Sequence, residues 1–267
     1  MGVPAPIQID HGESFEHLAK APIVEAIIEI RARAESAWDE ETVSSRIKSE
    51  LPDYPTRHPL YRGTFTAEMR IDRRDTSVQS DADVPALTDQ GWFGLRAESS
   101  DGRQIAAFTR DHFRFSRLRP YGNWKHTQAE ALRLWGHHLA IASTSFIHRV
   151  GVRFINRLEV AVPPDGLDFS EYFVGLEAVP VALPAVGFMY SDSLGVPGHE
   201  YFINVVRTFQ PLPDSARVAL LLDIDAFRTE PFATDRHKLG DILEDLHWLK
   251  NKVFFSAMSA RALEICR

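Results

Sequence analysis

The stretch Pro22–Ile23–Val24–Glu25–Ala26–Ile27–Ile28–Glu29–Ile30–Arg31 alternates between apolar and charged side chains and decides the fold class. The even positions are apolar, and this pattern continues through Ala32 and Ala34. A period of two over ten residues is typical of a β-strand with one buried and one polar face. We expect the core side to hold Val24, Ile28 and Ile30, and the polar side to hold Glu25, Glu29, Arg31 and Arg33.

Similar patterns along the chain predict more strands and three helices. Alternation predicts strands over 65–71, 91–98, 105–119, 146–162, 188–196, 201–209 and 217–227, with a loop over 72–90. Apolar residues every three or four positions predict a helix that starts at a Ser36-x-x-Asp39 capping box and stops before Pro52. The same spacing predicts two long amphipathic helices, over 125–142 and through 239–253.

The order of these elements predicts an α+β fold in a single domain over 1–267. Turns between the strands are too short for crossover helices, so the sheet is mainly antiparallel. The Pro163–Pro164–Asp165–Gly166 turn indicates a possible subdomain boundary near 161–168. A curled sheet is an open alternative. Its polar faces would then line a tunnel of acidic and guanidinium groups instead of a solvated face.

Composition places the chain among folded globular proteins. Of 267 residues, 44% are hydrophobic and 25% charged, which argues against disorder. We expect no membrane contact, because the longest uncharged apolar stretch, 178–191, is too short to span a bilayer and contains two prolines. Residues 1–15 do not resemble a secretory signal, and a lone Cys266 cannot form an internal disulfide. A cytoplasmic location fits these features.

The net charge of −7 hides a basic middle. Residues 96–157 hold 11 basic and 4 acidic residues, whereas 1–95 hold 10 and 17 and 158–267 hold 9 and 16. Arginine forks suit carboxylates and phosphates. Candidate anion-binding residues on the predicted strand faces are Arg31, Arg110, Arg114, Arg149, Arg153 and Arg157. The alternative is that these arginines pair with acidic residues of the same chain.

A second candidate site is the pair Asp223 and Asp225, which share one face of a predicted strand. Two carboxylates can hold Mg²⁺ or Mn²⁺ beside a substrate phosphate, or they can simply pair with arginines. The sequence contains no phosphate-binding loop, no dinucleotide fingerprint, no serine nucleophile elbow and no His-Glu-x-x-His motif. It therefore assigns no catalytic residue and predicts no cofactor beyond a possible Mg²⁺ or Mn²⁺.

Four stretches resemble an uncharacterised, sporadically distributed family of bacterial proteins of about this length. The first is the PIVEAIIEIR segment over 22–31, and the others are Arg149–Arg157 (RVGVRFINR), Leu222–Asp225 (LDID) and Leu246–Asn251 (LHWLKN). The resemblance implies an α+β cytoplasmic protein and transfers no catalytic residue. It also hints at defence-associated genes.

Two functions therefore remain open. The leading hypothesis is a non-catalytic binding or accessory protein whose Arg-rich face engages an anionic partner, which can be a protein, a nucleotide or a nucleic acid. The alternative is a metal-dependent phosphohydrolase or nucleotide-processing enzyme that uses Asp223, Asp225 and the strand-face arginines.

Overall fold

One antiparallel sheet of nine strands runs through the structure, a computed structural model that describes residues 5–64, 88–164, 166–176, 187–213 and 216–267. Its spatial order is β2 (Thr56–Thr64), β3 (Thr88–Glu98), β4 (Gln104–Thr109), β5 (His112–Leu118), β1 (Ile23–Arg31), β7 (Arg149–Ala161), β10 (Arg217–Arg228), β9 (Tyr201–Pro211) and β8 (Met189–Gly195). Two short strands, β6 (Phe146–Ile147) and β11 (Phe232–Ala233), pair separately. The described strands leave β2 and β8 as edges, so the sheet is not a closed barrel and the tunnel alternative is wrong.

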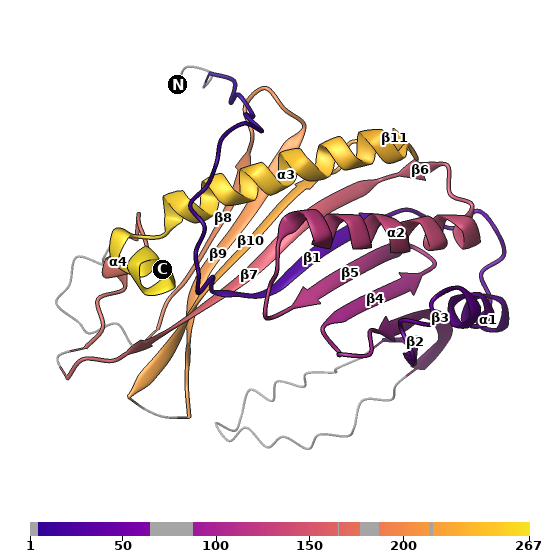
Figure 1. The fold of residues 1–267 in the computed structure, drawn as a ribbon, viewed down its shortest axis with the longest axis horizontal. Coiled ribbons are helices and arrows are strands. Elements are labelled where there is room, and N and C mark those ends of the chain that lie inside the picture. Colours follow the sequence, from indigo (N-terminus) through magenta and orange to yellow (C-terminus); the bar gives the residue numbers. More distant parts are fainter. Residues whose placement is uncertain (1–4, 65–87, 165, 177–186, 214–215) are drawn as a thin grey trace, which may run out of the picture.

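Helices cover one side of this sheet (Figure 1). They are α1 (Glu40–Glu50), α2 (Trp124–Ala142), α3 (Arg236–Ala257) and α4 (Ala260–Cys266), with a short 3₁₀ turn, η1, at Phe169–Glu171. The long helix α3 packs on β7 and β10, α2 packs on β5, and α1 packs on β3. The predicted α+β class is confirmed. None of the helices in the described residues has the length and apolar character needed to cross a bilayer.

Strand β1 lies in the middle of the sheet, and its alternating side chains show which side of the sheet is buried. Ala26, Ile28 and Ile30 are buried beneath the helices, with Ile28 opposite Phe115 on β5 and Val152 on β7. Successive side chains of a strand point to opposite sides, so Glu29 lies on the side away from Ile28 and Ile30. The strand ends at Arg31, so Arg33 lies beyond it and not on the predicted polar face. The side facing the helices is therefore the core.

Strand β7 joins the two halves of the chain. It pairs with β1 on one side and with β10 on the other, so the sheet runs continuously past the 161–168 turn. The observed strands β8, β9 and β10 lie close to the predicted ranges.

Several elements differ from the sequence predictions. The predicted 105–119 strand is two strands, because the Thr109 hydroxyl closes a turn by donating to the His112 carbonyl at 2.8 Å and accepting from the His112 N–H. Asp39, not Ser36, caps α1: its carboxylate accepts from the Thr42 N–H, and Ser36 donates to the Ile141 carbonyl instead.

Three further differences concern elements that the patterns did not indicate or place correctly. Strand β2 was not predicted, because Pro59 interrupts it and its residues do not alternate. Of the predicted 72–90 loop, residues 72–87 lie outside the described residues and 88–90 belong to β3; helix α4 was also missed. The predicted 65–71 strand lies outside the described residues.

Candidate functional site

Eight charged residues form what we call the charged face, on the side of the sheet away from the helices. They come from four neighbouring strands: Glu25, Glu29, Arg31, Arg114, Arg149, Arg153, Asp223 and Asp225. Each arginine of this set contacts a carboxylate of the same set. The face is thus a mixed network in which positive and negative groups are interleaved.

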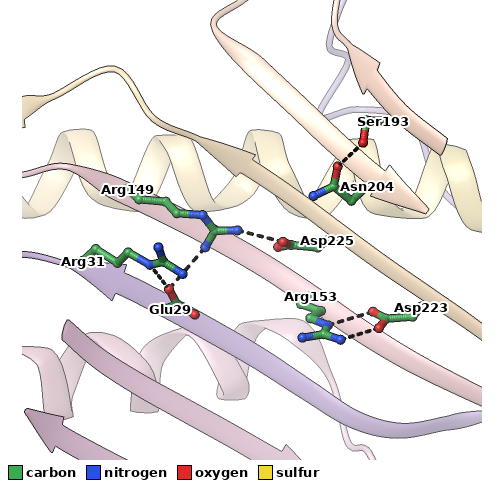
Figure 2. Close-up of polar contacts among 8 residues, drawn as sticks. All are labelled: Glu29, Arg31, Arg149, Arg153, Ser193, Asn204, Asp223 and Asp225. Atoms are coloured by element: carbon green, nitrogen blue, oxygen red, sulfur yellow. Dashed lines mark hydrogen bonds and ion pairs between the residues drawn. The ribbon is translucent and has the colours of Figure 1, made fainter. Parts of the chain in front are cut away.

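Arg149 is the centre of this network (Figure 2). Its guanidinium lies 2.7 Å from a carboxylate oxygen of Asp225 and 3.5 Å from one of Glu29, and it stacks on the Phe227 ring at 4.6 Å. Gly151 leaves the space for this position, because a Cβ there would lie only 2.8 Å from an Arg149 nitrogen. The Arg149 side chain is only 14% exposed, so this guanidinium is largely enclosed by its partners.

The two candidate metal ligands lie on β10 and point to the charged face, each toward an arginine (Figure 2). Asp223 accepts from Arg153 Nε at 2.8 Å, and this hydrogen bond raises the pKa of Arg153. Burial raises the pKa of Asp225, and the charges of Arg149 and Arg153 oppose that rise. Within the described residues, no group of three or more His, Cys, Asp or Glu side chains is arranged to hold a metal ion.

The remaining predicted anion-binding residues are divided between the face and its surroundings. Arg31 pairs with Glu29, and Arg114 lies 3.3 Å from Glu25. Burial would raise the pKa of Glu29, but the Arg31 hydrogen bond and the charges of Arg149 and Arg31 lower it below its usual value. Arg110 lies in the β4–β5 turn, beyond the strand face. Arg157 lies farther along β7 and contacts Glu159 at 3.2 Å.

A pocket of about 970 Å³ lies at the other end of β1, between the segment before that strand, the β5–α2 connection and the C-terminal half of α3. We call it the α3 pocket. Its walls are mainly apolar and aromatic, and its polar lining includes Asn156, Arg157, His247, Lys250 and Asn251. Concave, largely apolar sites with a few convergent polar groups are where small molecules bind most often.

Lys250 is the unusual group of the α3 pocket. The residue is 5% exposed, its Nζ lies 3.8 Å from the centre of the Phe154 ring, and it donates to Oδ1 of the adjacent Asn251. No carboxylate of the described residues forms an ion pair with it. Burial lowers the pKa of Lys250 to about 7, because an ammonium is poorly stabilised away from water. A buried amine without a counter-ion is costly for the fold.

Other polar groups of the pocket are partly satisfied donors. The His247 ring stacks on Trp124 at 4.2 Å, and burial, with the nearby Lys250 charge, lowers its pKa so that it is neutral. Asn156 donates to the Leu222 carbonyl at 3.0 Å. The buried Nε1 of Trp124 and Nε of Arg157 find no hydrogen-bond partner among the described residues. Two buried N–H donors, from Trp124 and Arg157, are thus without a partner in the described part of the chain.

Sequence reasoning missed this pocket, although two signals were available. Leu243, Leu246 and Phe254 lie on the buried side of α3, and Lys250 takes a position between them where an apolar residue is expected. Asn156 likewise interrupts the buried series of β7 between Phe154 and Leu158. Both residues belong to stretches quoted above, RVGVRFINR and LHWLKN. A charged or polar residue at a core position is more informative than a charge on a strand face.

Comparison with known proteins gives no further evidence on function. No protein-family model and no curated protein matches the chain. The charged face and the α3 pocket are therefore the features from which a function can be inferred.

Proposed function

We propose that the protein is a binding protein that takes a small organic anion with an apolar body into the α3 pocket. The proposal retains the expectation of an anionic partner, but it moves the contact from the strand-face arginines to Lys250. A cytoplasmic setting, in which the buried thiol of Cys266 stays reduced, belongs to the same proposal.

The observation that carries this proposal is the lone amine of Lys250. Protonated, it lacks a carboxylate partner in a largely apolar pocket, so an incoming anion would supply the missing charge. The arginines Arg149 and Arg153 differ in this respect, because Asp225 and Asp223 already occupy them. An anion at the charged face would have to displace these carboxylates, whereas one in the α3 pocket would displace none from Lys250.

The lining of the pocket defines the class of ligand. Trp124 adds a buried N–H without a partner among the described residues, so an acceptor-rich head such as a carboxylate suits the polar end. Phe254, Phe255 and Tyr121 favour an apolar or aromatic body. Of the charged side chains that line the pocket, Lys20, Arg119, Arg157 and Lys250 are basic and Glu16 is acidic, which favours an anionic ligand.

Isothermal titration calorimetry with phenyllactate and octanoate tests the proposal, because both are monocarboxylates with an apolar body. We expect at least one to bind the native protein and Lys250→Met to weaken that binding by roughly ten-fold or more. The matched control is Lys238→Met, an exposed lysine at the start of the same helix. Failure of both acids to bind, or equal binding by Lys250→Met, would refute the proposal.

A further inference from the structure

We propose that the ligand of the α3 pocket carries a carbonyl group, and that Lys250 captures this group reversibly as an imine. This inference rests on the proposed function and narrows the ligand class to 2-oxo acids with an apolar side chain. The geometry points to it because Lys250 is an enclosed amine that lines a cavity large enough for such a molecule.

The surroundings of Lys250 favour the neutral, nucleophilic form of its amine. Its contacts are an aromatic face and one amide oxygen, from Phe154 and Asn251. The other titratable groups that line the same pocket are Glu16, His17 and Lys20 before β1, Arg119 and Tyr121 after β5, Arg157 on β7 and His247 on α3. Of these, Glu16 is the one carboxylate, and it pairs with Arg267.

The acid–base behaviour of Lys250 agrees with this geometry. Burial lowers its pKa to about 7, so a large share of the side chain is a free amine near neutral pH. Exposed lysines keep a pKa near 10.4 and are almost fully protonated there. Lysines desolvated in apolar pockets are the ones that form Schiff bases with carbonyl substrates.

The proposed step balances without any other reactant. The Lys250 nitrogen attacks the carbonyl carbon, a C–N bond forms, and the proton lost from nitrogen passes to the carbonyl oxygen. The resulting carbinolamine loses its C–O bond, and the oxygen leaves as water with the second amine proton. Addition of water reverses the sequence, so the ligand is bound and released without oxidation or reduction.

The walls of the pocket suit the apolar side chain of such a ligand. Residues Phe254 and Phe255 would contact the apolar side chain of the acid.

Phenylpyruvate and phenyllactate provide a matched pair of probes, because they share charge and size and differ in the carbonyl. The native protein is incubated with either acid, reduced with borohydride and mapped by peptide mass spectrometry over its six lysines. We expect a reduced adduct with phenylpyruvate at Lys250 above the level at the other five lysines, and no adduct with phenyllactate. Lys250→Met should lose this adduct, and Lys238→Met should keep it.

The outcomes separate this inference from the proposed function. Binding of phenyllactate without a phenylpyruvate adduct at Lys250 would overturn imine capture and leave the binding function standing. An adduct spread evenly over the six lysines would also overturn it, because exposed amines would then react as well as the buried one. Absence of binding by phenyllactate and octanoate, with no adduct, would overturn both. Labelling of Lys250 should also reach half its maximum near pH 7, well below the other lysines.

Discussion

Strand β7 contributes to two sites that differ in whether their cations are paired with carboxylates. On one side Arg149 and Arg153 meet Asp225 and Asp223, so each cation of the charged face has a counter-ion within the protein. On the other side Phe154 lies against Lys250, a cation that pairs with none of the described carboxylates. Internal pairing leaves little capacity for a partner, whereas an unpaired buried cation stores free energy that a ligand can recover. This difference supports a structural role for the charged face and agrees with the binding role that we propose for the α3 pocket.

The largest expected effect comes from placing an unpaired charge where no pocket exists. Ile28 is 1% exposed beneath the helices, so Ile28→Asp buries a carboxylate without a partner and should cost more than about 4 kcal/mol. Urea denaturation measures this cost. The control is Glu25→Gln on the opposite side of the same strand, which should cost less than about 1 kcal/mol. An Ile28→Asp protein as stable as the native one would show that β1 is placed wrongly.

Removing the unpaired cation of Lys250 should stabilise the protein instead. We expect Lys250→Met to raise the free energy of unfolding at pH 7, on the order of 2–4 kcal/mol, because it replaces a desolvated amine with an apolar chain of similar length. Lys238→Met should change stability by about 0.5 kcal/mol at most. If Lys250→Met is less stable than the native protein in thermal and urea unfolding, the amine has a partner that the comparison omits.

The pH dependence of stability isolates the same group. The pKa of Lys250 is about 7 in the folded protein and near 10.5 in the unfolded chain, so the unfolded state binds more protons between these values. The stability of the native protein should therefore rise with pH from about 7 toward 10, relative to that of Lys250→Met. The difference in free energy of unfolding between the two proteins should shrink over this range. Below pH 7 the difference should be constant. A difference that does not vary from pH 6 to 10 would contradict the lowered pKa.

Breaking the most enclosed ion pair of the charged face should lower stability less than Ile28→Asp does. It should lower stability more than the loss of an exposed ion pair does. Arg149→Met leaves Asp225 and Glu29 without their shared guanidinium, and we expect a loss of about 2 kcal/mol. Gly151→Ala should act in the same direction, because the added Cβ meets the Arg149 guanidinium. If Arg149→Met unfolds at the same temperature as the native protein, Arg149 does not have this central role.

The smallest effect is expected at the rim of the same network. The Arg153 side chain is 46% exposed, so solvent screens its pair with Asp223, and Arg153→Met should cost less than about 1 kcal/mol. The difference between Arg149→Met and Arg153→Met then measures how enclosure strengthens a charge pair. Equal losses in urea denaturation would show that burial does not distinguish them.

Much of the fold could be predicted from local patterns. The alternation over 22–31 correctly indicated β1, and the apolar spacing of α2 and α3 indicated both long helices. Prediction failed where one side chain sets a boundary, as at Thr109, or where Pro59 interrupts a strand. Such boundaries depend on single hydrogen bonds that a periodic pattern does not contain.

By itself the sequence determined which side of each long element is buried, because the period of apolar residues dictates which face leaves water. It could not determine which charges find partners. Asp225 lies 76 positions from Arg149, and only the order of β7 and β10 in the sheet brings the two together. In the same way, α3 packing against β7 sets Lys250 on the ring of Phe154. Coulombic interactions and desolvation depend on distance in space, so only the tertiary structure decided which cation has a carboxylate partner and which one does not.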